Sequence, residues 1–224
     1  MTHSAFLKLA ALAAGLSALT TLGVHFIDFP AADFQSRLLL ARDPLYIAQK
    51  QMIVLHCLLV IVSMFGAALL AGQYNRGLAA LGALFFAVFG VTEITRMLSV
   101  LVYLNPLREK YLAATDPAVQ QWIQLQIEGF NLAAGVMFLL FILAFGLGNL
   151  FLGLALVRSC GPDRHMAVLL LYWAGITLLG FGNYFWENPV LGTATEWNGK
   201  FGQPLIRLFA GWWLWQRALQ AMSG

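Results

Sequence analysis

The apolar positions of the chain gather into six long runs, and the stretches between the runs hold most of the polar residues. A helix needs about 20 mostly apolar residues to cross the hydrocarbon core of a bilayer. Six runs are of about this length: residues 4–27, 49–70, 78–104, 131–157, 165–184 and 204–219. Runs such as 136–144 are continuously apolar and lack the alternation of a transmembrane β-strand. The pattern predicts an all-α polytopic membrane protein, a bundle of six transmembrane helices that forms a single domain over residues 1–224.

The fourth run has a helical pattern that begins before its apolar part. Asp116 is an expected N-cap, with Pro117 at the first helical position. Polar residues then recur at intervals of three or four as the chain enters the run: Gln121, Gln124, Glu128 and Asn131. Residues 116–158 therefore form either one long helix or two helices with a break near Gly129.

The composition places the chain outside the soluble globular class. It is 60% hydrophobic and 10% charged, whereas soluble domains average roughly 25% charged residues. The net charge of +3 comes from 13 basic and 10 acidic residues, which is too sparse for a nucleic-acid footprint. Two cysteines form no disulfide framework. We expect the protein to be surrounded by membrane lipids and not to bind nucleic acid.

The basic residues suggest an orientation in the membrane. We call side A the end with both termini and the turns at 73–77 and 158–165, and side B the end with the three longer loops. Side A has short turns with one acid, Asp163, against five basic residues: Lys8, Arg76, Arg158, Arg164 and Arg217. Lysine and arginine in short loops favour the cytoplasmic side. We expect a protein of a cytoplasmic membrane with both termini in the cytoplasm.

Ionisable residues inside the predicted spans are the main functional signal, because each costs roughly 2.5–3.5 kcal/mol on insertion scales. Glu93 and Arg96 lie at i and i+3 on the third run, with Tyr103 on the same side. At a rise of about 1.5 Å per residue, Glu93 lies about 16 Å from the side B end of its run. It is therefore expected near the middle of the membrane.

Other predicted spans bring polar residues to the same half of the membrane. His56 lies on the second run, and Glu128 and Asn131 begin the fourth. The first run has a polar face with Ser17, Thr21, His25 and Asp28. Together these positions predict a hydrated pocket that is open to side B and closed towards side A. Its expected ligand-binding residues are Glu93, Arg96, Tyr103, Glu128, Asn131 and His56.

Structural interpretations of the same residues stay open. Arg96 could pair with Glu93 in its own helix or with Glu128 on a neighbouring one, as intramembrane charges usually do. His56 could be a buried histidine whose ring bonds a nearby carbonyl group. The tryptophans of the last run, at 212, 213 and 215, are expected to face lipid and the interface.

The sequence offers little support for a cofactor or for enzymatic chemistry. The weak candidates for metal ligands are His25, His56, Glu93 and Glu128, which come from four different runs and follow no Glu-x-x-His or His-x-x-x-His spacing. Gly-x-Ser-x-Gly is absent from the sequence. Cys57 and His56 are adjacent, so on a helix their side chains point about 100° apart. We expect no metal or haem cofactor, and no enzymatic activity is assigned.

A resemblance to a known family rests on the third and fourth runs. The residues that carry it are Asn75-Arg76, Asp116-Pro117, Phe145-Gly146, the segment 149–153 and the segment 157–159. Over residues 78–159 the chain resembles the bacterial DUF4386 family of integral membrane proteins. The resemblance implies a similar helical architecture and a bacterial source. It implies no functional residue, because the family has no assigned activity.

The leading hypothesis is a binding or transport protein for a small or lipid-like anionic ligand. In it, Arg96 anchors the ligand and Glu93 accepts a proton. A second hypothesis is an accessory subunit whose tryptophan-rich last helix docks on a membrane-protein partner. A third is a membrane metalloenzyme or redox subunit that uses the histidines and glutamates.

Overall fold

The computed structural model describes residues 2–27, 29, 31 and 33–223, and every regular element in this part of the chain is helical. The long helices are α1 (His3–Phe26), α3 (Pro44–Ala71), α4 (Arg76–Ser99), α6 (Pro117–Leu156), α7 (Pro162–Trp186) and α9 (Gln203–Ser223). The short elements are α2 (Phe34–Leu39), the 3-10 turn η1 (Leu40–Arg42), the π turn η2 (Val100–Leu104), α5 (Asn105–Ala113), α8 (Pro189–Trp197) and the π turn η3 (Asn198–Gly202). The predicted all-α fold class is confirmed.

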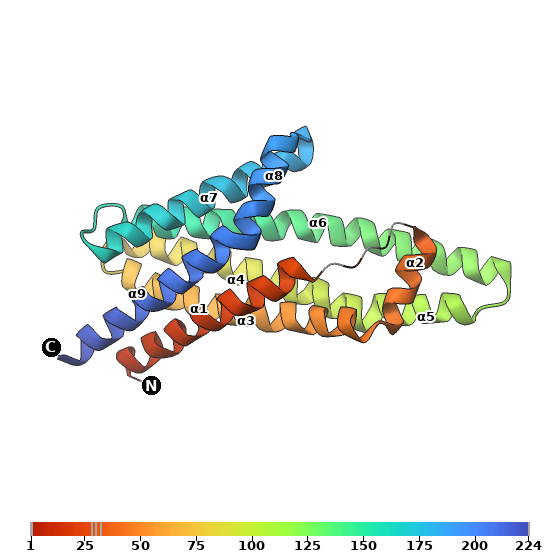
Figure 1. The fold of residues 1–224 in the computed structure, drawn as a ribbon, viewed down its shortest axis with the longest axis horizontal. Helices are drawn as coiled ribbons and strands as arrows, with labels where there is room; N and C mark the ends of the chain where they lie inside the picture. The colour runs from red at the N-terminus through yellow and green to blue at the C-terminus, as the bar shows by residue number, and fades with distance from the viewer. Residues whose placement is uncertain (1, 28, 30, 32, 224) are drawn as a thin grey trace.

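The six long helices form a closed ring. Their order around it is α9, α1, α3, α4, α6 and α7, and α7 in turn contacts α9. The two chain ends lie at the same end of the molecule, where α1 and α9 run side by side (Figure 1). Small residues let the helices approach closely: a Cβ atom on Gly148 of α6 would lie 2.9 Å from the ring of Phe86 on α4.

Five helices are long and apolar enough to cross a membrane. They are α1, α3, α6, α7 and the continuous helix from Arg76 to Ala113, in which α4 passes through η2 into α5. The sixth expected span corresponds to α9, which is not among these five. Length and composition therefore support a multi-pass membrane protein.

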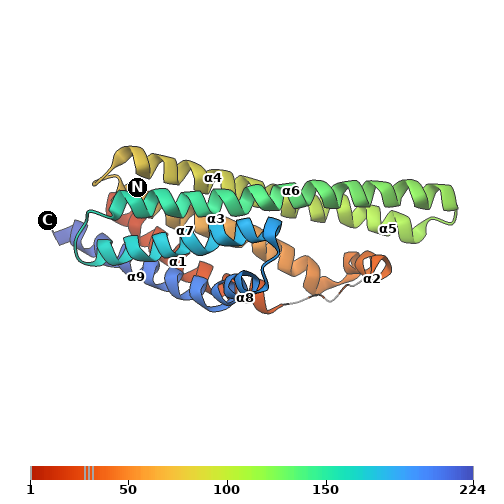
Figure 2. The same ribbon diagram turned by 90° about the horizontal axis from the view of Figure 1, so that it is seen from above.

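Of the two alternatives for residues 116–158, the single long helix is found, and the continuous helix from Arg76 to Ala113 is longer than the expected run 78–104. Helix α6 is a single helix of 40 residues without a break at Gly129, and Asp116 caps it by accepting a hydrogen bond from the Ala118 amide. At about 1.5 Å per residue it is about 60 Å long, twice the thickness of the hydrocarbon core. With η2 and α5 it forms a helical hairpin that extends beyond α1, α7 and α9 (Figure 2).

The hairpin extension is held to α2 and α3 by its own apolar cluster. The buried members are Leu38, Tyr46, Val100, Leu104, Leu107, Ile123 and Ile127. The buried Arg108 donates hydrogen bonds to Tyr46 and Asn105 within this cluster. The side B end of the expected third span, together with the helix that precedes the fourth, thus belongs to a separate packing unit beyond the helix ring.

After a sharp reversal, α8 packs back against the last turns of α7, where Thr195 of α8 lies beside Gly180. Glu187 ends α7 in the left-handed conformation, with φ of 49°, and Asn188 caps α8 through its side chain. Helix α8 and η3 then lead into α9. The sequence pattern did not predict these elements, since residues 185–203 were expected to form a loop.

Candidate functional site

A cavity of about 500 Å³ lies inside the helix ring. It receives residues from all six long helices and from α8 and η3. Its walls are mainly apolar and include Val24, Ile53, Phe89, Phe138, Phe141 and Ile142. The volume lies within the range of about 300–1,000 Å³ that is typical of small-molecule sites.

Arg207 of α9 is the most unusual residue of this cavity. It is 3% exposed, and the surroundings of its guanidinium are largely aromatic. Its Cζ atom lies 4.9 Å from the ring centre of Trp173 and 5.9 Å from that of Phe145. Nη1 donates a long hydrogen bond of 3.4 Å to Ser17 Oγ, and Nε is buried without a hydrogen-bond partner among the described residues.

Arg207 lies near the middle of the helix ring along its length. Its neighbours Ser17, Phe145 and Trp173 are about 16–21 Å from the side A ends of α1, α6 and α7, at a rise of about 1.5 Å per residue. The hydrocarbon core is about 30 Å thick. In the described part of the chain, none of the ion pairs includes Arg207. A buried cation without an ion-pair partner among the described residues points to a function, because buried charges are normally paired.

A second arginine of the cavity is fully engaged. Arg96 donates two hydrogen bonds to Glu93, from Nε over 2.7 Å and from Nη2 over 2.6 Å. The Glu93 side chain is 5% exposed and the Arg96 side chain 21%. The guanidinium of Arg96 also lies 5.3 Å from the ring centre of Phe138. Of the predicted pairings, the one within α4 is therefore found, and Glu128 takes no part in it.

The side B end of the cavity has further polar residues. His25 packs against Gly199 of η3, and Glu196 of α8 pairs with Lys200 over 2.6 Å. The hydrogen bond from Lys200 lowers the pKa of the Glu196 carboxyl group. Deeper in the cavity, His56 Nδ1 is hydrogen-bonded to the Thr20 hydroxyl over 2.8 Å, which joins α1 and α3.

Three of the six predicted ligand-binding residues line the cavity, namely His56, Glu93 and Arg96. Tyr103, Glu128 and Asn131 do not line it and are exposed. Tyr103 bonds Gln126, and Gln124 bonds Glu128, both on the hairpin extension or its base. The structure does not bring these three residues to the cavity, because the hairpin carries them past the side B end of the ring. Of the described part of the first run's polar face, Thr21 and His25 line the cavity, whereas Asp28 lies outside the described residues.

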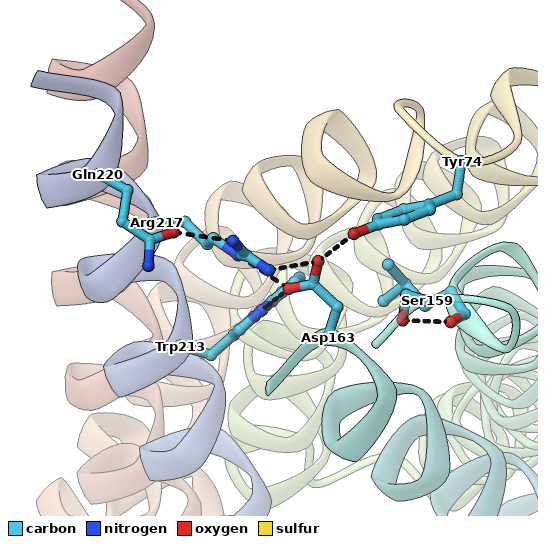
Figure 3. Close-up of polar contacts among 7 residues, drawn as sticks. Tyr74, Ser159, Asp163, Trp213, Arg217 and Gln220 are labelled. Atoms are coloured by element: carbon cyan, nitrogen blue, oxygen red, sulfur yellow. Dashed lines mark hydrogen bonds and ion pairs between the residues drawn. The ribbon is translucent and has the colours of Figure 1, made fainter. Parts of the chain in front are cut away.

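The side A end is closed by a polar cluster around Asp163, at the start of α7 (Figure 3). The carboxylate is 3% exposed and accepts hydrogen bonds from Trp213 Nε1 at 2.7 Å, Arg217 Nε at 2.8 Å and the Tyr74 hydroxyl at 2.5 Å. The bond to the carboxylate raises the pKa of the Tyr74 phenol. Arg217 also forms an ion pair with Asp163. The cluster ties α7 to α9 and to the turn between α3 and α4.

This cluster corrects one expectation, namely that the tryptophans of the last run face lipid and the interface. Trp213 is instead fully buried and bonded to Asp163, while Trp212 and Trp215 are 48% and 39% exposed. Between Arg207 and Asp163, the side chains of Trp173, Trp213 and Leu214 are at most 1% exposed and form a dense plug.

The candidate metal ligands do not form a cluster. Among the residues that the structure describes, no group of three or more histidine, cysteine, aspartate or glutamate side chains is placed to hold a metal ion. His25, His56 and Glu93 share the cavity, whereas Glu128 lies outside its lining.

No family model, curated protein or solved structure matches this chain. The resemblance to the DUF4386 family stays a prediction. The functional argument therefore rests on the residues of the cavity.

The Asp163 cluster generates a prediction about stability. Replacing Asp163 with asparagine removes the charge that Arg217 and Trp213 bond, and we expect the free energy of unfolding to fall by about 1–3 kcal/mol. Thermal unfolding of the purified protein in mild detergent measures the change. Tyr74→Phe is the matched control and should cost about 1 kcal/mol or less, because it removes one neutral donor and leaves the charge pair. An unchanged melting temperature for Asp163→Asn would contradict the role of the cluster as a lock.

Proposed function

We propose that the chain is a six-span protein of a bacterial cytoplasmic membrane, with α9 as the sixth span and both termini in the cytoplasm. Helix α9 has 21 residues, about 32 Å at the usual rise, and packs along α1. Two of its polar residues face inwards, as Arg207 lies against Trp173 and Arg217 bonds Asp163. Counting α9 as a span therefore exposes neither of these two arginines to lipid tails.

We further propose that the protein binds or transports a small or lipid-like anionic ligand in the cavity. The observation that carries this proposal is Arg207, a buried guanidinium that meets an apolar cavity without a carboxylate partner among the described residues. A charged group left unpaired inside a membrane is costly, and a bound anion would remove that cost. The anchor of the ligand is then Arg207, whereas Arg96 is already neutralised by Glu93.

The Glu93–Arg96 pair suggests how binding could be coupled to a proton. An anion that approaches Arg96 competes with Glu93 for the same two N–H donors. A carboxylate that loses its cation in an apolar site favours its protonated form. We therefore propose that Glu93, in the side B part of the cavity, takes up a proton when an anion binds Arg96.

An accessory-subunit role is the second candidate. The observation that favours it is an exposed apolar face on α6, where Val119, Trp122 and Leu125 are 44%, 60% and 62% exposed. These residues lie at intervals of three on the hairpin extension, which leaves an apolar stripe for a membrane-protein partner. Under this proposal, a partner protein would co-purify with the chain in stoichiometric amount.

The anion proposal is tested by identifying the molecules that co-purify with the protein from its own membrane. Wild type and Arg207→Gln are purified in the same mild detergent, extracted into organic solvent and compared by negative-ion mass spectrometry. We expect an anion at near-stoichiometric level in the wild type and at least 10-fold less in the variant, because the variant lacks the anchoring charge. Arg42→Gln is the control, since Arg42 is a half-exposed surface residue paired with Glu109. Equal anion content in all three samples, or a co-purified protein in place of an anion, would count against the proposal.

The proposed orientation is tested with the two native cysteines. Cys160 is exposed in the side A turn between α6 and α7, whereas Cys57 is buried beside the cavity. A membrane-impermeant maleimide should label Cys160 in inside-out vesicles and leave it unlabelled in intact spheroplasts. Cys160→Ser should abolish the signal. Labelling in intact spheroplasts would reverse the orientation.

A further inference from the structure

The surroundings of Arg207 restrict which of its atoms can meet a ligand. Trp173 and Phe145 lie within 6 Å of the guanidinium carbon, so aromatic rings occupy its immediate surroundings. Nη1 is used by Ser17. Within the described residues, Nε has no acceptor, and no hydrogen bond from Nη2 is present. The edge without a hydrogen-bond partner among the described residues is the one formed by Nε and Nη2.

This edge carries two parallel N–H donors with a fixed spacing. Such a fork matches the two oxygens of a planar carboxylate, which is the basis of bidentate recognition by arginine. A second unsatisfied buried donor, Trp173 Nε1, belongs to the indole that lies against the guanidinium. Around the Arg207 guanidinium, the described buried atoms without a partner are thus two donors, Arg207 Nε and Trp173 Nε1, whereas the unsatisfied acceptor of the cavity lining, Asn198 Oδ1, belongs to η3.

The charges around the cavity limit the charge of the ligand. With histidine counted as neutral, its charged lining residues are Glu93, Arg96, Glu196 and Arg207. Arg96 neutralises Glu93, and Lys200 neutralises Glu196. One positive charge, that of Arg207, is left over in the described lining. A bound monoanion would bring the net charge of the cavity to zero. A dianion would leave a net negative charge in the membrane interior, which is unfavourable.

The remaining walls of the cavity indicate the chemical character of the rest of the ligand. From Arg207 towards side B the cavity is bordered by aromatic and branched aliphatic side chains: Phe89, Phe138, Phe141, Ile53, Ile142 and Ile176. Apolar walls favour an apolar molecule by roughly 25 cal/mol for each Å² removed from water. The dense plug of Trp173, Trp213 and Leu214 closes the other direction.

We propose that the ligand is a hydrophobic monocarboxylate, bound with its carboxylate on the Nε/Nη2 edge of Arg207 and its apolar body between α3, α4 and α6. This inference rests on the proposed anion-binding function and narrows it to one chemical class. It orients the molecule with its head group at mid-membrane and its apolar body towards side B.

The inference is tested with 2-bromodecanoate and the protein in lipid nanodiscs. The bromine sits next to the carboxylate and quenches tryptophan fluorescence only at close range, so a head group on Arg207 brings it to Trp173. We expect a saturable quenching component in the wild type that is absent from Arg207→Gln and from Trp173→Phe. Arg207→Lys should weaken binding roughly 10-fold or more, because it keeps the charge and loses the fork. Arg42→Gln should behave as wild type.

Competition on the wild-type protein identifies the chemical class. Decanoate should displace the saturable component, whereas decanol and decylammonium should leave it in place. If decyl phosphate displaces it at 10-fold lower concentration than decanoate, the carboxylate assignment is wrong and the anion-binding function stands. If no anion gives a component that depends on Arg207, both proposals fail. Should Arg207→Gln and Arg207→Lys not fold, the competition series on the wild type still decides between the classes.

Discussion

The structure depends on how the interior of the helix ring accommodates Arg207, for which the described residues supply no ion-pair partner. Arg207 is buried against aromatic rings, where an unpaired charged side chain is unfavourable by several kcal/mol. Two aromatic rings and the hydroxyl of Ser17 contact the guanidinium of Arg207. They lessen the free-energy cost of burying it but supply no opposite charge. All six long helices of the ring line the cavity that this arginine meets. The packing of the helix ring therefore has to offset the unfavourable burial of the Arg207 charge.

The two ends of the ring handle charge in different ways. At side A, Asp163 takes hydrogen bonds from α9 and from the turn between α3 and α4, above a plug of fully buried side chains. At side B, the charges of Glu93–Arg96 and Glu196–Lys200 are paired but border open volume. A lock at one end and a lined cavity at the other favour ligand access from side B, or from the lipid beside it.

The helices and the side B cavity could be predicted from sequence, because run length and helical spacing are local properties. Glu93 and Arg96 at i and i+3 already implied a charge pair on one face, and their pairing is found. The error at Tyr103, Glu128 and Asn131 came from treating each span as if it ended at the membrane surface. Helix α6 continues as a single helix of 40 residues, which puts these side chains on the hairpin extension or its base.

Arg207 was missed for a related reason. It lies near the start of the last apolar run, where an arginine normally reaches the interface. In the structure, α8 and η3 lead directly into α9, so Arg207 lies well inside a helical stretch and not at its start. Asp163 was likewise counted only as a loop charge, although Trp213 and Arg217 meet it from a helix 50 residues later. Contacts between such distant elements leave no periodic signal in the sequence.

The central claim is that Arg207 is kept for a ligand and at the expense of stability. The most direct measurement is the free energy of unfolding of ligand-free protein in detergent, wild type against Arg207→Met. Removing an unpaired buried charge while keeping an apolar chain of similar length should raise stability by about 1–4 kcal/mol. A less stable Arg207→Met protein would show that the arginine holds the bundle together through Trp173, Phe145 and Ser17, and the account of the cavity as an anion site would be contradicted.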